Sequence, residues 1–200
     1  MRRKRRSGLG IHLYQLTPGA VRVAYHPPTM STETHSNHRR PDFAIEPAPG
    51  QESVWDYPRP PALARDARTI VVRDDRVTLA ETTAGIKVME TASAPTFYIP
   101  REDVDLDLLV PVSGTTYCEW KGTASYWALA RQPEEPVAWT YERPRARFER
   151  IRDYIAFYPG RVECRLDGET ARTQPGKFYG GWITNDVVGP FKGEPGTGHW

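Results

Sequence analysis

Proline and glycine interrupt this chain so often that long helices are disfavoured. The sequence has 19 Pro and 16 Gly, or 35 of its 200 residues, and this 17.5% exceeds the average usage of about 12%. Proline removes a backbone donor and glycine weakens regular structure. The chain is therefore expected to build short elements joined by turns, in one ordinary domain with a tail.

Short β-branched runs separated by turn residues make up most of the chain after about residue 62. Asp167-Gly168 is the strongest hairpin signal. The one predicted helix, 146–158, has an apolar stripe and is closed by Pro159-Gly160. The predicted strands are 69–73, 76–80, 86–91, 97–99, 103–110, 115–121, 123–129, 161–166 and 169–173. This pattern predicts a mainly β fold: a single compact antiparallel β domain, barrel- or tent-like, with one short helix and a disordered N-terminal tail.

Charge and composition divide the chain near residue 52. Residues 1–29 hold six basic and no acidic side chains, which leaves residues 30–200 with a net charge of −4. Residues 1–51 are predicted to be a disordered leader and tail, of which 1–29 could be an upstream extension before Met30, and 52–200 the β-rich domain. An acidic domain disfavours nucleic acid as a partner, although the basic cluster at 2–6 leaves a nucleic-acid arm as the alternative.

The sequence also limits location and chemistry. No run approaches the roughly 20 apolar residues of a membrane span, so we expect a cytoplasmic protein with its two cysteines, Cys118 and Cys164, reduced. Of five His, only His199 lies in the predicted domain. Triads, Cys-His dyads and zinc sites therefore lack their imidazoles, and neither a metal nor a cofactor is predicted.

Two segments concentrate the remaining chemistry. In the first, a two-residue turn at Lys121-Gly122 would place Glu119 opposite Ala124 and Tyr117 opposite Tyr126, all on one face. Glu119 would then be an acid, a base or a ligand anchor between aromatic rings, unless it is an edge carboxylate paired with an Arg.

The second segment, 178–186, contains Gly180-Gly181, which would let the backbone approach a ligand or form a bulge. Asp103, Asp105 and Asp107 resemble a metal-binding row, but a solvated strand face explains them more simply.

Several Trp- and Gly-containing blocks occur in one order from about residue 52 to residue 200. They are Trp55-Asp56-Tyr57-Pro58-Arg59-Pro60, Glu90-Thr91, Tyr98-Ile99-Pro100, Cys118-Glu119-Trp120-Lys121-Gly122, Tyr126-Trp127, Ala156-Phe157-Tyr158, Tyr179-Gly180-Gly181-Trp182 and Gly189-Pro190-Phe191-Lys192-Gly193. In these blocks the chain resembles the bacterial and fungal family known as domain of unknown function 427. The resemblance implies a compact β-rich domain, and one label used for the family is nucleotidyltransferase-like.

Three functions follow as hypotheses. The leading one is binding of an unknown small polar or aromatic molecule. The alternatives are an enzyme, of nucleotidyltransferase type or with Glu119 and Lys121 as catalytic groups, and a protein-interaction module that uses exposed Trp faces. Oligomeric state is left open. The other predicted ligand-binding residues are Tyr98, Trp120, Tyr126, Tyr179, Gly180, Gly181, Trp182 and Lys192.

Overall fold

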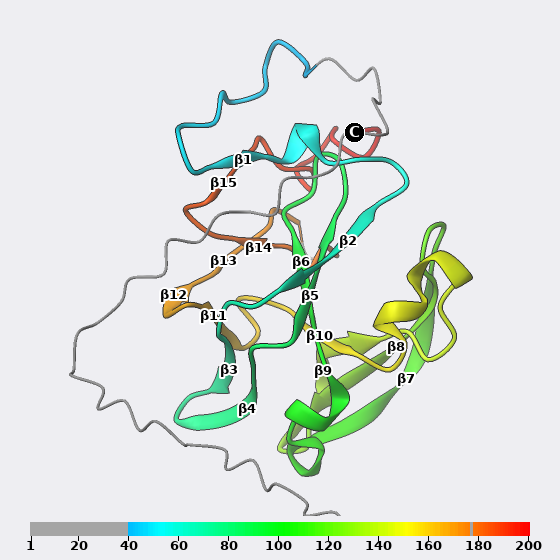
Figure 1. Cartoon of the computed structure of the whole chain (residues 1–200). Helices are drawn as coiled ribbons and strands as arrows, with labels where there is room; N and C mark the ends of the chain where they lie inside the picture. The colour runs from blue at the N-terminus through cyan, green and yellow to red at the C-terminus, as the bar shows by residue number, and fades with distance from the viewer. Residues whose placement is uncertain (1–39, 177) are drawn as a thin grey trace, which may run out of the picture. The chain divides into compact units, whose positions relative to one another are not determined.

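The computed structural model describes residues 40–176 and 178–200 (Figure 1). The predicted leader, 1–29, and the predicted tail up to residue 39 therefore lie outside the described residues. The strands are β1 Glu52–Ser53, β2 Ala62–Asp66, β3 Ile70–Asp74, β4 Val77–Thr82, β5 Gly85–Met89, β6 Thr96–Ile99, β7 Leu109–Cys118, β8 Gly122–Leu129, β9 Gln132–Thr140, β10 Ile155–Phe157, β11 Glu163–Leu166, β12 Glu169–Thr170, β13 Arg172–Thr173, β14 Trp182–Ile183 and β15 Val187–Val188. Short 3₁₀ helices are η1 Val54–Asp56, η2 Arg101–Asp103, η3 Leu106–Leu108 and η4 Ala146–Ile151.

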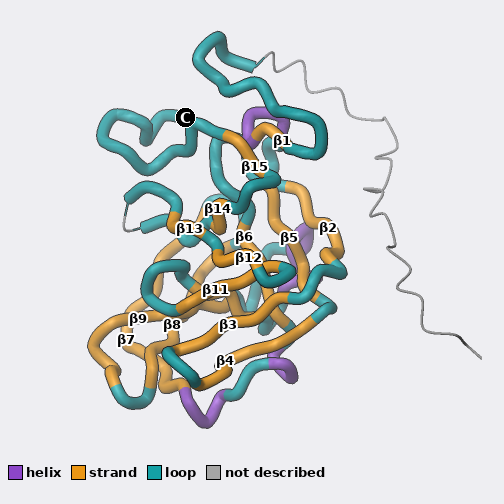
Figure 2. The backbone as a smooth tube through the Cα atoms, turned by 90° about the vertical axis from the view of Figure 1, so that its left-hand side faces the viewer, coloured by secondary structure: helices purple, strands orange, loops and turns teal. Residues whose placement is uncertain are grey.

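Two antiparallel sheets organise the described residues. The larger has seven strands in the order β2-β5-β6-β10-β9-β8-β7, and the smaller has four in the order β12-β11-β3-β4. Figure 2 views the smaller sheet in front of the larger one. Two short pairs, parallel β1-β15 and antiparallel β13-β14, complete the sheets. The prediction of a mainly β, antiparallel fold is confirmed.

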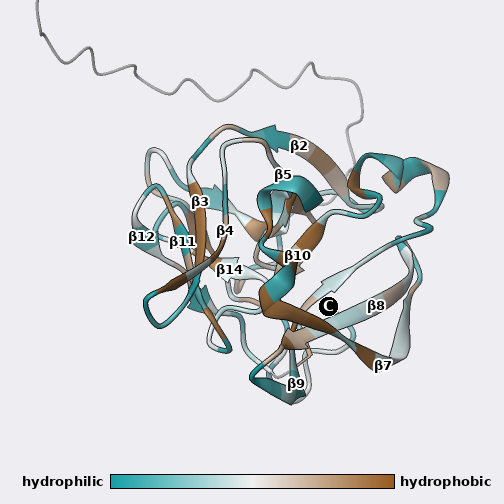
Figure 3. Cartoon of the chain, turned by 90° about the horizontal axis from the view of Figure 1, so that it is seen from below, coloured by the Kyte–Doolittle hydropathy of each residue, from teal (hydrophilic) through white to brown (hydrophobic). Residues whose placement is uncertain are grey.

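The larger sheet has a different environment on each face because side chains alternate along its strands. One face carries Phe97, Ile99, Ile155 and Phe157, which are buried in the main core. Residues of the smaller sheet, including Ile70, belong to the same core. Figure 3 shows β10 and β5 between the smaller sheet and strands β7–β9. This face is therefore closed by sheet-on-sheet packing.

The opposite face carries a row of side chains from five strands. Ile86, Tyr98, Ala156, Trp139 and Tyr126 are paired in that order across β5, β6, β10, β9 and β8. Directly paired residues project to the same face. They form a second core together with Phe148 and Ile151. The row brings three ring-bearing residues from separate strands onto one surface.

Two predicted elements are wrong. The predicted helix 146–158 is instead a short 3₁₀ segment, η4, which is kinked at Phe148, followed by strand β10. Tertiary pairing of β10 with β6 and β9 satisfies backbone groups that a helix would have paired internally. The predicted strand 103–110 is instead η2 and η3 followed by the start of β7, because Asp105 caps η3 by accepting the backbone N–H of Asp107.

The segment 40–51, predicted as part of the tail, contacts the domain. The Ile45 backbone N–H donates to the Gly189 carbonyl at 2.9 Å. Arg40 pairs with Asp56 at 2.6 Å, and the Phe43 ring lies 5.2 Å from that of Trp200. The ordered domain therefore includes residues before 52. The described residues contain no helix long and apolar enough to cross a membrane.

Candidate functional site

A cavity of about 170 Å³ opens on the second face of the larger sheet. We call it the aromatic cavity, because eight of its lining residues carry aromatic rings: Tyr98, Tyr117, Tyr126, Trp139, Tyr141, Tyr158, Phe178 and Tyr179. The remaining lining residues are Val88, Glu90, Ser93, Ala94, Thr96, Thr116, Cys118, Lys121, Ala124, Gln174, Gly180 and Gly181. Strands β5–β9 and the segment before β14 thus meet at one site.

Hydrogen bonds among the rings fix the cavity's inner wall. Trp139 Nε1 donates to the Tyr98 hydroxyl at 3.2 Å. Ala156 stands between these two residues in the sheet row, and its small side chain leaves room for the contact. The Tyr126 hydroxyl hydrogen-bonds to Thr116 Oγ1 on β7 at 2.6 Å. The rings are therefore held in place before any ligand arrives.

Gly180 and Gly181 close one side of the cavity because neither has a side chain. A Cβ on Gly180 would lie 2.6 Å from Cζ3 of Trp139, and one on Gly181 would lie 2.7 Å from the carbonyl oxygen of Ala94. Buried Gln174 fixes this side: it accepts the Ala94 N–H at 3.0 Å and donates to the Lys192 carbonyl at 2.9 Å. Gly180 therefore permits close approach of the backbone to the Trp139 ring, and Gly181 permits close approach to Gln174 and Ala94.

A charged cluster lies at the edge of the aromatic cavity. Glu90 accepts a hydrogen bond from Lys192 Nζ at 2.9 Å and forms an ion pair with Lys121 Nζ at 3.6 Å. Burial favours the neutral carboxyl, but the two ammonium groups outweigh it and hold the pKa of Glu90 below its ordinary value. Glu90 is thus an ionised, partly buried carboxylate at neutral pH.

The buried tyrosines of the cavity are neutral at the same pH. Burial raises the pKa of Tyr98, Tyr141 and Tyr158 above that of an ordinary phenol. Each hydroxyl can therefore donate and accept a hydrogen bond. The pKa shifts of Glu90 and of these tyrosines all move away from neutrality, so none of the four is poised to exchange a proton at pH 7.

Two of the most exposed aromatic side chains flank the mouth. Tyr117 and Phe178 are each 65% exposed and both line the aromatic cavity. The Tyr117 hydroxyl accepts a hydrogen bond from Arg145 at 2.5 Å, and the Phe178 ring lies 5.4 Å from that of Tyr179. Exposed rings on both sides of an opening offer apolar contact area to a molecule that enters it.

The predicted register of the β7–β8 hairpin is wrong. Cys118 pairs with Gly122, and Tyr117 pairs with Thr123 rather than with Tyr126. The turn contains Glu119, Trp120 and Lys121, so Lys121-Gly122 is not the two-residue turn that we expected. Gly122 has φ +103° and begins β8.

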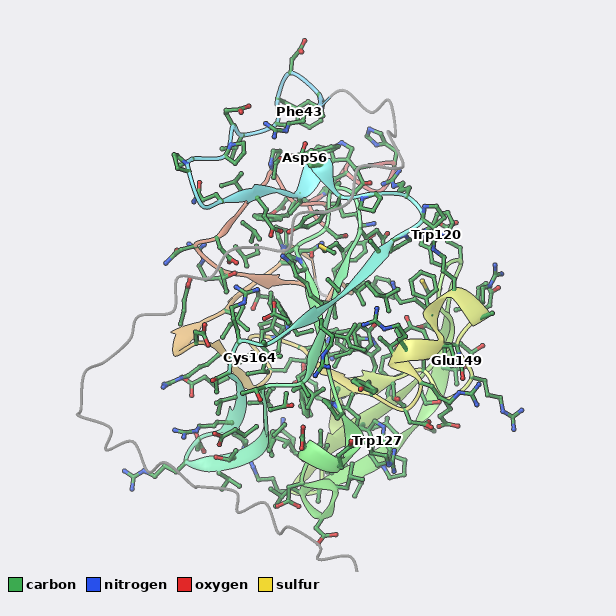
Figure 4. The ribbon with its side chains drawn as sticks, in the orientation of Figure 1. Phe43, Asp56, Trp120, Trp127, Glu149 and Cys164 are labelled. Carbon is green, nitrogen blue, oxygen red and sulfur yellow. The ribbon has the colours of Figure 1, made fainter. Side chains whose placement is uncertain are left out.

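The shift in register moves the predicted residues to new places. Val112 stands opposite Tyr126, where we had placed Tyr117, and Thr116 stands opposite Ala124, where we had placed Glu119. Glu119 is exposed and outside the cavity lining. Glu119 is therefore not brought together with Gly181. Figure 4 shows Trp120 at the loop of the hairpin, far from Trp127. Trp120 packs against the second core without lining the cavity.

The structure brings most of the other predicted site residues together. Tyr98, Tyr126, Tyr179, Gly180, Gly181 and Lys121 line the aromatic cavity. Lys192 contacts two residues that line the cavity: its Nζ donates a hydrogen bond to Glu90 and lies 5.2 Å from the centroid of the Tyr179 ring. Trp182 does not: it is fully buried in the main core and donates its indole N–H to the Phe157 carbonyl at 3.0 Å.

Sequence reasoning missed Glu90, Trp139, Tyr141 and Gln174. Glu90 and Gln174 stand outside the two segments on which we concentrated, and only the sheet order and the loops bring them to the cavity. Trp139 lies in β9, which we did not predict because Pro133 and Pro136 interrupt it. The pairing of Pro136 with Ala128 occurs beside a register shift, where a missing donor is tolerated.

The fold and this site define a class: a small antiparallel β domain with an aromatic cavity on the free face of its larger sheet. A family model described as domain of unknown function (DUF427) matches residues 62–168. The chain therefore belongs to that family, as the sequence blocks predicted. A search of curated proteins found no match.

The family model's name also carries a nucleotidyltransferase label. Nucleotidyl transfer uses carboxylates that share magnesium ions. Among the described residues, no three His, Cys, Asp or Glu side chains are grouped so that they could hold one metal ion. The cavity's carboxylate, Glu90, is already engaged by two lysines. The residues present therefore do not fit that metal set, and we derive no step through it.

Proposed function

We propose that this domain binds a small aromatic or otherwise planar molecule in the aromatic cavity. The observation that carries the proposal is the preformed wall of rings and hydroxyl groups around about 170 Å³ of space. Ligand sites combine such walls with a few fixed polar groups. The volume is smaller than the roughly 300 Å³ of drug-sized sites, so the ligand is small or inserts only one ring.

Binding is better supported than the two alternatives. The resolved pKa shifts of Glu90, Tyr98, Tyr141 and Tyr158 favour fixed charge states over acid–base catalysis at neutral pH. A docking module would need a continuous apolar patch. The exposed large apolar side chains of the described residues are instead dispersed: Phe43 and Ile45 in the N-terminal segment, Val77 at the start of β4, and Tyr117 and Phe178 at the mouth.

A thermal-shift screen of small planar metabolites would test the proposal, with Phe178→Ala as the variant. Phe178 is 65% exposed, so its removal should change the free energy of unfolding by less than about 0.5 kcal/mol. Losing one stacking ring, worth about 0.5–1.5 kcal/mol, should weaken the affinity for a hit about two- to tenfold.

The matched control is Phe43→Ala. Phe43 is 54% exposed but packs on Trp55 and Trp200, outside the cavity lining. It should leave ligand affinity unchanged. A screen without hits, or hits that bind equally to the Phe178 variant and to other cavity variants, would contradict the proposal.

A further inference from the structure

The charged cluster at the edge of the aromatic cavity holds more positive than negative charge. Glu90 supplies one carboxylate, whereas Lys121 and Lys192 supply two ammonium groups. The Lys side chains are only 11% and 10% exposed. Arg59 adds a further positive charge that lowers the pKa of Glu90. A buried cluster with an uncompensated positive charge is costly unless an anion joins it.

Lys121 is the cation that remains available. Its Nζ lies 3.6 Å from Glu90, too far for a good hydrogen bond. Among the described residues the Lys121 Nζ donates no hydrogen bond, although an ammonium group has three donors; only the backbone N–H of Lys121 donates, to Cys118 Sγ. Lys121 lines the cavity and is nine-tenths buried. Its ammonium group therefore has donors left for a ligand in the cavity.

The rings of the cavity already interact with the protein's own cations. Lys192 Nζ lies 5.2 Å from the centroid of Tyr179, and the Arg161 guanidinium lies 4.2 Å from that of Tyr158. Both distances are within the range of cation–π attraction. A cationic ligand would have to compete for these faces beside two lysines. The rings therefore do not act as a cage for an external cation.

We propose that the ligand is a small planar anion, with a carboxylate or equivalent oxyanion on Lys121 Nζ and its ring among the aromatic walls. This inference rests on the proposed function and adds the sign of the ligand's charge. Charge-assisted hydrogen bonds to a buried ammonium are among the stronger polar contacts. The ligand's ring would lie against Tyr117 and Phe178, the two exposed aromatic side chains of the cavity lining, and would cover part of their apolar surface.

Three probes of nearly equal shape test the charge. Benzoate, benzamide and benzamidinium carry charges of −1, 0 and +1 on the same ring, and each is titrated into the full chain by isothermal calorimetry at pH 7. We expect benzoate to bind at least tenfold more tightly than the other two. Inorganic phosphate is a fourth probe: binding as tight as that of benzoate would overturn the role of the ring.

Variants of Lys121 locate the effect. Lys121→Met should abolish the preference for benzoate, and Lys121→Arg should keep it, because the charge remains. Thermal unfolding of both variants shows whether they are folded. If a variant does not fold, the three probes on the wild-type chain still test the charge preference. Equal or tighter binding of benzamide or benzamidinium would overturn the charge inference and leave the proposed function standing. Failure of every compound in the broad screen would overturn both.

Discussion

Glu90 determines how the lysines of the cavity are balanced, because it is the carboxylate that both of them contact. Burial alone would raise its pKa, but Lys121 and Lys192 lower it below the ordinary value. A carboxyl whose pKa is lower in the folded than in the unfolded state stabilises the fold above its unfolded pKa. That contribution is lost as the pH falls through the folded pKa.

The prediction concerns Glu90→Gln. At pH 7 the free energy of unfolding of the variant should be about 1–3 kcal/mol lower than that of the wild type, because two buried ammonium groups lose their charged partner. As the pH falls below about 4.3, the ordinary pKa of a Glu, towards the lower pKa of Glu90 in the folded protein, the difference should shrink. Chemical denaturation of both proteins from pH 7 to pH 3 measures it.

The comparison allows for other acid-sensitive groups. Burial would raise the pKa of Asp186, but its hydrogen bond to Thr184 and its pairing with Arg68 lower it. Asp186 therefore contributes the same pH dependence to the free energy of unfolding of both proteins. An offset between wild type and variant that stays constant down to pH 3 would contradict the account of Glu90.

At the scale of elements, the β7–β8 hairpin depends on one backbone conformation. Gly122 has φ +103° and pairs with Cys118 across the end of the turn. A Cβ there would lie 3.5 Å from the Arg143 carbonyl oxygen, an ordinary contact, so the cost of a side chain comes from the backbone. The left-handed region costs a non-glycine residue about 1–2 kcal/mol.

Gly122→Ala should therefore lower the free energy of unfolding by about 1–2 kcal/mol. It should also loosen Lys121, the residue just before it, and so weaken anion binding. Thr123→Ala, at the next and exposed position of β8, is the control and should change stability by less than about 0.5 kcal/mol. Equal stability of the two variants, measured by urea unfolding, would argue against the backbone account.

Elements with a local turn signal were predictable from the sequence, and elements defined by distant partners were not. Asp167-Gly168 forms the expected hairpin, because Leu166 pairs with Glu169 and both turn residues have positive φ. At Lys121-Gly122 the same kind of signal failed, since the glycine begins a strand instead of ending a turn. Segment 146–158 has a helical stripe, yet β10 is held by strands β6 and β9.

The candidate site shows the same limit. Tyr98, Tyr126, Tyr179 and the paired glycines were predictable, because aromatic and glycine residues are dense in short blocks there. Glu90 was not, because its importance depends on Lys121 and Lys192, which lie 31 and 102 positions further along the chain. No local sequence pattern predicts that these three side chains contact one another. We chose Glu119 because a two-residue turn at Lys121-Gly122 would have placed it opposite Ala124, between aromatic rings. The turn instead contains Glu119, so that register does not form.

At the scale of the whole domain, the larger sheet separates stability from binding. One face is closed against the smaller sheet by the main core, which includes Leu79 and Trp182. The other carries the aromatic cavity, whose wall includes Tyr126. Because the larger sheet stands between the main core and the cavity, with side chains of its strands projecting to both sides, a change in the main core need not disturb the cavity.

The last prediction tests this separation with two variants. Leu79 is 1% exposed in the main core, so Leu79→Ala should cost about 2–5 kcal/mol. At about 2–4 °C per kcal/mol for a domain of this size, the melting temperature should fall by about 4–20 °C. Tyr126→Phe keeps the ring and removes only the hydroxyl that bonds to Thr116, a loss of about 0.5–1.5 kcal/mol. Benzoate affinity is measured well below both melting temperatures. It should be unchanged in the Leu79 variant and altered in the Tyr126 variant, because only the second variant changes a group in the cavity wall. If Leu79→Ala weakened binding as much as Tyr126→Phe, the two faces would be coupled through the strands, and the cavity would have to be treated as part of the main core.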